Sequence, residues 1–208
     1  LEVRTVALAA VLAAACAAVS VLFCHVLHGA GRLAGKFLPD PFVRAAAGGA
    51  LLIALTLLAG SGDYNGAGMD VVERAIGGEA LPWAWALKLL FTAVTIACGF
   101  KGGEVVPSFF VGACFGCVVG GLLGLPAGFA AALGLAAVFC GAVNCPIASV
   151  FLSIELFGAG GLVYFAVVCA VSYLLSGYCG LYGSQTILYS KLRAEFINVR
   201  TNQEDAGE

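Results

Sequence analysis

Apolar residues run in long blocks along this chain, and short breaks rich in glycine, proline or charge separate the blocks. No charged residue occurs between Val105 and Ile154, or between Leu156 and Ser190. A helix that spans a bilayer needs about 20 apolar residues, so these two blocks hold several full or partial crossings. The pattern predicts helices over residues 5–27, 45–59, 69–76, 81–100, 107–125, 127–142, 147–157, 162–176 and 184–197.

Several of these helices are too short to cross a bilayer, and the breaks between them lie within apolar sequence. Residues 28–44 form a polar connection in which Asp40 and Pro41 suit a helix start. Other breaks are rich in glycine, as at residues 158–161 and 177–183. Irregular backbone at membrane depth is tolerated only inside protein or beside a watery cavity. Broken helices are typical of the ion and substrate sites of transporters.

Composition narrows the class of protein. The chain has 208 residues, of which 62% are hydrophobic and 11% charged, and its mean hydropathy is +1.03. These values exclude a single soluble domain and predict a multi-pass integral membrane protein, most simply of the cell or inner membrane. The net charge of −2 gives no basic field for nucleic acid. The polar, charged stretch after Lys191 favours a cytoplasmic C-terminus.

Neither an enzyme nor a metal protein is indicated. The nine cysteines are scattered through apolar segments and are expected to be small buried residues rather than disulfides or ligands. His25 and His28, the two histidines, lie together at one helix end, and no Ser/His/Asp or metal-ligand cluster accompanies them. We therefore expect no catalytic site, no metal and no cofactor.

The strongest candidate for chemistry is Gly102-Gly103-Glu104-Val105-Val106-Pro107. The glycines allow the backbone to approach a bound group, and Pro107 suits the first turn of the following helix. The free N–H groups and positive dipole end of that helix can bind an anion without a basic side chain. The alternative is an ordinary transition from loop to helix.

Glu104 is the candidate for coupling protons to anions, because a carboxylate near the membrane interior is costly and commonly functional. The alternative is a helix-terminal Glu that faces water or headgroups. Glu155 is also expected at depth, and a structural pairing with a backbone N–H or a neighbouring helix is favoured for it. Phe109 and Phe110 could line the anion path with positive ring edges, although core packing is the simpler role.

A neutral hydroxyl could hold an anion from the far side. Tyr178, Tyr182 and Tyr189 surround the last break, and Tyr182 is closest to the start of the last predicted helix. A tyrosine at a helix end can also be a simple interfacial anchor.

The segment from Lys101 to Gly116 resembles the GGxFxP-type segment of the CLC family of chloride channels and anion/proton transporters. Cys145-Pro146-Ile147 leading to Ser153-Ile154-Glu155-Leu156 is similar to a second stretch of that family. Residues 185–188 (QTIL) resemble its last membrane helix. The order and spacing of segments agree over residues 5–197.

The resemblance implies an all-α integral membrane fold, namely the second of two inverted-topology repeats of a CLC protomer. It divides the chain into a membrane domain over residues 1–197 and a polar tail over residues 198–208. The family assembles as a homodimer in the bilayer, and its gating Glu and two further anion-binding segments lie in the first repeat. Because the chain begins Leu-Glu-Val without Met or a signal-like n-region, it is expected to be a later part of a longer protein.

The same resemblance implies that the backbone N–H groups of Glu104 and Val105 hold the central anion. Alignment on Ile187-Leu188 places Ser184 where the family has Tyr, so Tyr182, two residues earlier, is the preferred donor. Glu104 itself resembles the fluoride-exporting branch, although Val106 stands where that branch often has a hydroxyl residue.

The leading hypothesis is therefore transport of chloride or fluoride by a CLC-type channel or proton-coupled antiporter. Two other hypotheses stay open. One is a secondary transporter of another fold for a small organic anion. The other is a membrane-embedded assembly subunit that transports nothing.

Overall fold

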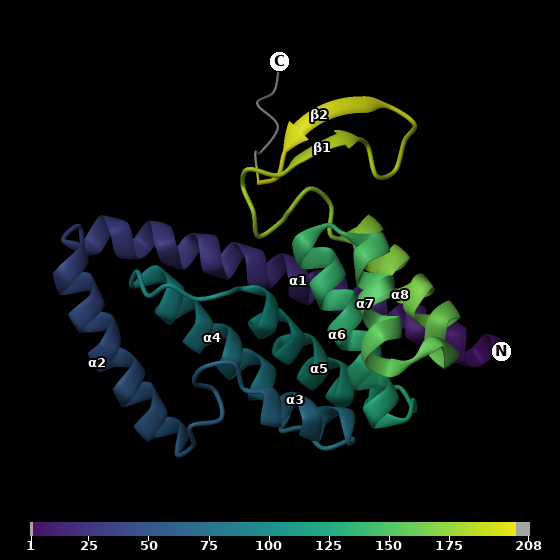
Figure 1. Ribbon diagram of the computed structural model, residues 1–208, viewed down its shortest axis with the longest axis horizontal. Coiled ribbons are helices and arrows are strands. Elements are labelled where there is room, and N and C mark those ends of the chain that lie inside the picture. Colours follow the sequence, from purple (N-terminus) through teal and green to yellow (C-terminus); the bar gives the residue numbers. More distant parts are fainter. Residues whose placement is uncertain (1, 203–208) are drawn as a thin grey trace.

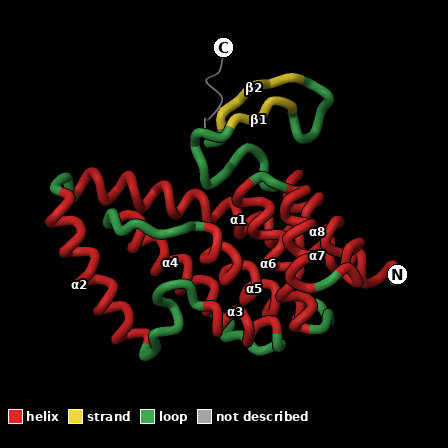
Figure 2. Tube along the Cα trace, in the orientation of Figure 1, coloured by secondary structure: helices red, strands yellow, loops and turns green. Residues whose placement is uncertain are grey.

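The computed structural model describes residues 2–202 and is mostly helical, with one small sheet near the C-terminal end (Figures 1 and 2). The elements are α1 (Val3–Phe37), α2 (Pro41–Ala59), α3 (Met69–Ile76), α4 (Ala84–Ala97), α5 (Val105–Leu122), α6 (Ala127–Val143), α7 (Pro146–Phe157), the 3₁₀ turn η1 (Ala159–Gly161), α8 (Leu162–Leu175), β1 (Thr186–Tyr189) and β2 (Phe196–Arg200).

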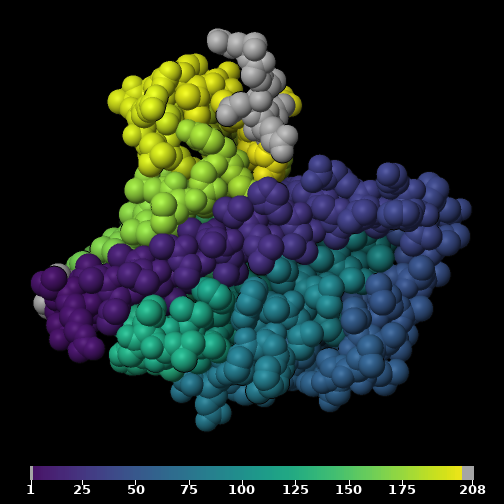
Figure 3. Space-filling view, turned by 180° about the vertical axis from the view of Figure 1, so that it is seen from behind, coloured from purple at the N-terminus to yellow at the C-terminus, as the bar shows by residue number. Residues whose placement is uncertain are grey.

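The centre of the molecule is α6. Every residue from 130 to 142 is buried, and α1, α5 and α8 pack around this helix. A helix that is apolar on all sides must be covered on all sides, and the sequence of α6 is of that kind. The long α1 crosses the back of the molecule from one end to the other (Figure 3).

Close contact between α5 and α6 depends on small residues. Gly112, Gly116 and Gly120 of α5 face Ala130 and Gly134 of α6. A Cβ atom at Gly112 would lie 2.5 Å from the Gly134 carbonyl oxygen, and one at Gly116 would overlap the Ala130 carbonyl oxygen. Small residues at four-residue spacing let membrane helices approach backbone to backbone. This packing fixes the position of the N-terminal end of α5.

The edge helix α2 is packed very differently. Asp40 caps its start by accepting from the Phe42 and Val43 N–H groups, as predicted. Within the helix only Gly48 is buried, where it lies directly against Cys98. Most of the remaining apolar surface of α2 is exposed, including Leu58 at 84%. Such a surface is typical of contact with lipid or another protein.

Among the described residues, α1, α2 and α5 are long and apolar enough to cross a membrane by length and composition. Four shorter apolar helices accompany them: α4, α6, α7 and α8 with the preceding turn. The short helices predicted from the pattern are therefore present. Seven of the nine cysteines are buried, as expected for small apolar residues, and Cys145 and Cys179 are half-buried.

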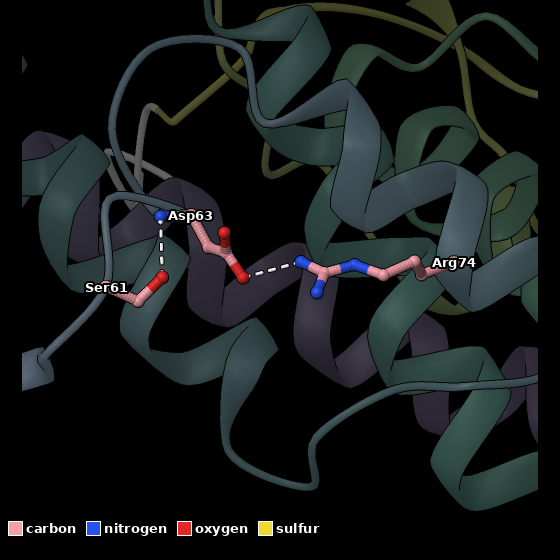
Figure 4. A network of polar contacts seen from close by, with 3 residues as sticks. All are labelled: Ser61, Asp63 and Arg74. Carbon is pink, nitrogen blue, oxygen red and sulfur yellow. Dashed lines mark hydrogen bonds and ion pairs between the residues drawn. The ribbon is translucent and has the colours of Figure 1, made fainter.

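A polar loop connects α2 to α3. The Arg74 side chain of α3 pairs with Asp63 of this loop, and the Asp63 N–H donates to the Ser61 hydroxyl at 3.1 Å (Figure 4). The Arg74 guanidinium holds the pKa of the Asp63 carboxyl below its usual range. Both side chains are substantially exposed, so this ion pair fastens the loop only weakly.

Two sequence predictions of secondary structure are wrong. The first helix continues through most of the predicted polar connection and ends at Phe37. Residues 184–197 form no helix; β1 and β2 pair there as an antiparallel hairpin, with Ile187 opposite Val199. The β-branched and aromatic residues of these strands suit a pleated surface, and Asn198 takes the left-handed conformation at φ 46°. The fold is therefore mostly helical, which agrees with the predicted class, and it carries one hairpin near its C-terminal end.

The hairpin also bears on the predicted division of the chain. The boundary between membrane domain and tail, after residue 197, falls inside β2. Part of the predicted polar tail is thus ordered strand, and residues 203–208 lie outside the described part of the chain.

Candidate functional site

The N-terminal end of α5 is presented by an irregular loop. Gly99 ends the preceding turn at φ +89°, and residues 101–103 have no regular structure. Glu104 is the N-cap of α5, but no side chain caps the helix. The first N–H groups of a helix have no intrahelical partner, so this end remains free to accept an anion. Burial of Pro107 and Ser108 holds the first turn in place.

One hollow joins this loop to a distant part of the chain. Gly102, Gly103 and Glu104 form one side of a hollow of about 470 Å³, and residues 181–184 form the other. The second side includes Tyr182 and Ser184, which the sequence analysis selected as alternative hydroxyl donors. The structure therefore brings together the glycines, the carboxylate and the hydroxyl candidates that sequence reasoning named separately.

The three hydroxyl candidates differ in their surroundings. The Tyr178 hydroxyl donates to Ser190 Oγ at 3.1 Å, so it is occupied by the hairpin. Tyr182 is 43% exposed, and its hydroxyl makes no hydrogen bond with any described residue. Ser184 is also exposed beside it. Of the tyrosines, Tyr182 is the one whose hydroxyl is free to meet a ligand in the hollow.

The valines and phenylalanines after Glu104 lie deeper. Val105 and Val106 are half-buried in the first turn of α5. Phe110 is fully buried and packs against Tyr64, with ring centroids 6.2 Å apart. Phe109 packs edge-on against Phe139 at 5.0 Å. Neither ring is among those lining the hollow, so a role of either ring in lining the anion path stays a prediction.

A second hollow, of about 530 Å³, lies on the other side of the same loop. Gly102 and Gly103 line it together with Val106 and the side chain of Lys88 from α4. Lys88 is 1% exposed and donates to the backbone carbonyls of the 60–68 loop, at 2.6 Å to Gly66 and 3.2 Å to Tyr64. It has no carboxylate partner among the described residues. A buried positive charge therefore lies beside the loop of residues 101–103.

Two carboxylates were singled out from the sequence, and their surroundings differ. Glu104 is half-buried at the start of α5. Its carboxylate makes no hydrogen bond within the described part of the chain. Glu155 is exposed on α7 and likewise has no partner there. The structural pairing expected for Glu155 is therefore not observed, because its side of α7 faces outward.

Sequence reasoning missed the polar residues that hold the second side of the hollow. They are Asn144, Lys191, Thr201 and Asn202, and each makes at least two hydrogen bonds. One signal was available: Asn144 ends an apolar helix just before Cys145-Pro146, where a left-handed cap is common. The other three lie in a segment that was interpreted as helix and tail.

The chain is similar to known proteins over most of its length. Residues 1–177 match the sequence model of the voltage gated chloride channel family. The chain is 36% identical over 177 residues to a chloride/fluoride channel protein of Pseudomonas syringae pv. tomato, covering 82% of this chain and 39% of that protein. It is 30% identical over 89 residues to an uncharacterized protein of Methanocaldococcus jannaschii, covering 43% of this chain and 22% of that protein.

A solved structure is similar as well. The crystal structure of a CLC-type fluoride/proton antiporter superposes with a TM-score of 0.84 at 33% identity. The superposition covers 88% of this chain and 46% of that one. The chain thus spans less than half the length of these relatives.

Proposed function

Because the chain belongs to the voltage gated chloride channel family, we propose that it forms part of a transport pathway for small inorganic anions, chloride or fluoride. The observation that carries this proposal is the hollow shared by Gly102, Gly103, Glu104 and Tyr182. Its two sides come from segments far apart in the sequence, and each offers donors to an anion. A secondary transporter of another fold is excluded by the structural match.

An anion in this hollow would be held by neutral donors. The backbone N–H groups of residues 102–106 and the positive end of the α5 dipole form one side. The Tyr182 hydroxyl approaches from the other. Lys88 lies behind the loop and adds a positive potential, without lying in the hollow itself. Neutral donors give moderate affinity, which permits release as well as binding.

Fluoride is the anion we favour, with chloride as the alternative. Two of the similar proteins are a chloride/fluoride channel protein and a CLC-type fluoride/proton antiporter. Glu104 supports coupling to protons, since its carboxylate borders the hollow and has no hydrogen-bond partner within the described part of the chain. When protonated it could donate to the anion, and when ionised it would repel it. Movement of a proton and of an anion would thereby be linked, as in an antiporter.

The surroundings of this pathway are also proposals. Exposed apolar side chains on α2 and α7, including Phe42, Leu58, Ile147 and Phe151, fit a lipid bilayer or a second copy of the protein. A homodimer in the membrane is therefore proposed for the full protein.

The test is anion efflux from liposomes that contain the full protein, followed with fluoride, chloride and pH electrodes. Glu104→Gln should reduce coupled proton movement at least about tenfold, because an amide cannot carry the proton. Glu155→Gln is the matched control, since this carboxylate is exposed on α7 away from the hollow. Equal fluxes for both variants and the unmodified protein would refute the role of Glu104. A stable protein that moves no anion would instead favour an assembly subunit.

A further inference from the structure

Lys191 connects the turn of the C-terminal hairpin to the helices by hydrogen bonds. Lys191, in the turn between β1 and β2, donates through Nζ to Asn144 Oδ1 at the end of α6. The same ammonium donates to the Tyr173 carbonyl at 2.9 Å and to Ser176 Oγ at 3.2 Å, and lies 4.1 Å from the centre of the Tyr173 ring. The tip of the hairpin is therefore held at the ends of α6 and α8.

Residues at the other end of the hairpin form hydrogen bonds with the loop that carries Tyr182. Thr201, which is 2% exposed, donates through Oγ1 to the Tyr182 carbonyl at 2.6 Å. Asn202 makes two hydrogen bonds with Gly180: its Nδ2 donates to the Gly180 carbonyl at 2.7 Å, and its Oδ1 accepts from the Gly180 N–H at 3.1 Å. The backbone on both sides of Leu181 is thus bonded to residues that follow β2.

The end of α6 holds the same loop from the opposite side. The Leu181 N–H donates to the Ala142 carbonyl at 2.9 Å. Asn144 Nδ2 donates to the Cys179 carbonyl at 2.8 Å, and Gln185 Nε2 donates to the Val143 carbonyl at 3.1 Å. A Cβ at Gly180 would lie 2.7 Å from Asn144 Nδ2, so the loop and the helix end touch without spare room.

Without these contacts the loop would be mobile, because it contains Gly177, Gly180 and Gly183, and glycine has the greatest backbone freedom. A mobile loop loses conformational entropy when the Tyr182 hydroxyl binds an anion. A loop that is already fixed does not lose this entropy, so it binds the anion more tightly. Of the residues that fix it, Thr201 and Asn202 follow residue 177, where the match to the family model ends, whereas Asn144 lies within the matched part.

We propose that the C-terminal hairpin is a clamp that positions Tyr182 beside the anion hollow, and that Thr201 is the positioning residue through which it acts. The proposal rests on the proposed function, since it assigns the clamp to the same hollow. Thr201 Oγ1 bonds to Tyr182 only through the backbone carbonyl and also lies 3.3 Å from the Gln185 carbonyl, so its removal changes where the Tyr182 hydroxyl lies and not what that hydroxyl is.

The test measures fluoride efflux against fluoride concentration for four variants of the full protein in liposomes. Thr201→Val removes the hydrogen bond while keeping the shape, and should raise the half-saturating concentration about fivefold, the usual effect of one hydrogen bond. Thr201→Ser keeps the hydroxyl and should stay within about twofold of the unmodified protein. Thr186→Val is the matched control, because Thr186 is an exposed hairpin threonine whose side chain makes no hydrogen bond with described residues.

The fourth variant separates positioning from general stability. Tyr182→Phe removes the donor itself, so adding Thr201→Val to it should cause no further change in half-saturation. The proposal would be overturned if the half-saturating concentration of the double variant rose by the product of the two single effects. It would also be overturned if Thr201→Val had the same half-saturating concentration as the unmodified protein. If Thr201→Val does not fold, Asn202→Ala is tested in its place with the same expectation. Absence of flux in the unmodified protein would refute the proposed function, whereas sensitivity to Tyr182→Phe alone would refute only the clamp.

Discussion

The two sides of the anion hollow are held in place by different physics. The side with Gly102 and Gly103 precedes α5, whose glycines lie directly against the backbone of α6. The side with Tyr182 has no such packing and is held by hydrogen bonds from Asn144 and Thr201. A single added methyl group disrupts the close packing of small residues. In a network of hydrogen bonds, each substitution removes only the stability due to the bonds that it deletes. The two sides should therefore respond to different substitutions, and by different amounts.

The largest effect is expected at the α5–α6 contact. Gly134→Val should reduce the free energy of unfolding by at least about 3 kcal/mol, because the new side chain would overlap the Gly112 carbonyl oxygen on a neighbouring backbone. Gly121→Ala is the control within α5, since a Cβ there meets no atom closer than 4.0 Å. Thermal unfolding in detergent and size-exclusion profiles would measure both. Similar stability for the two variants would contradict the packing argument.

A smaller effect is expected at the end of α6, where Asn144 holds the Tyr182 side of the hollow. Asn144 has φ 57° and bonds to both Cys179 and Lys191. Asn144→Ala loses these bonds and strains the left-handed backbone, which should cost about 2 kcal/mol. Hydrogen exchange should quicken at residues 178–185 and remain slow within α6. Asn144→Gly keeps the backbone conformation and should lose less. Uniformly faster exchange throughout the protein would argue against a local role.

Lys191 offers a pH test of the hairpin side. Burial lowers the pKa of Lys191 to about 8 from its usual 10.5. Below pH 8 the amine is protonated in both folded and unfolded chains, so its contribution is constant. Between about pH 8 and 10.5 only the unfolded chain keeps the proton, and stability due to this group therefore rises with pH. The difference in melting temperature between the unmodified protein and Lys191→Met should shift in favour of lysine from pH 7 to pH 9.5. A difference independent of pH would contradict the burial of this amine.

The smallest effect is expected at the exposed ion pair in Figure 4, which touches neither side of the hollow. Arg74→Gln should leave the melting temperature at pH 7 unchanged within error, because exposed ion pairs contribute little. Any contribution is present above the ordinary pKa of an aspartate and disappears as pH falls through the lowered pKa of Asp63. A clear loss of stability at pH 7 in high salt would show that this loop matters more than its exposure indicates.

The side of the hollow next to α5 could be predicted from the sequence in detail. Gly102, Gly103, Glu104 and Pro107 lie within six consecutive residues, and each has a local reason to be there: close backbone approach, a helix start or a fixed φ. The short helix over residues 69–76 was predicted with its observed bounds, because its polar and apolar positions repeat with helical period. The end of α1 was placed too early, because charged and glycine residues at 28–37 are tolerated in an exposed helical turn.

The hydroxyl side shows where prediction from sequence stops. Tyr182 was selected by its place in the chain, and its position in the hollow depends on Thr201 and Asn144, which lie 19 and 38 residues away along the sequence. A hydrogen bond over such a separation leaves no periodic pattern. The strands β1 and β2 are also difficult to predict because they are short. Their pairing depends on contacts with each other and with the ends of α6 and α8.

The sequence by itself determined the class of this protein, the number and apolar character of most helices, and the position of the glycine-rich loop before α5. These properties follow from local composition, because burial in lipid and helix capping act within a few turns of chain. The tertiary structure alone decided that residues 181–184 lie opposite that loop, that the C-terminal segment is a hairpin, and that Glu155 is exposed. Those outcomes depend on contacts between segments that are distant in the sequence. Such contacts form, and contribute free energy, only when the whole chain packs.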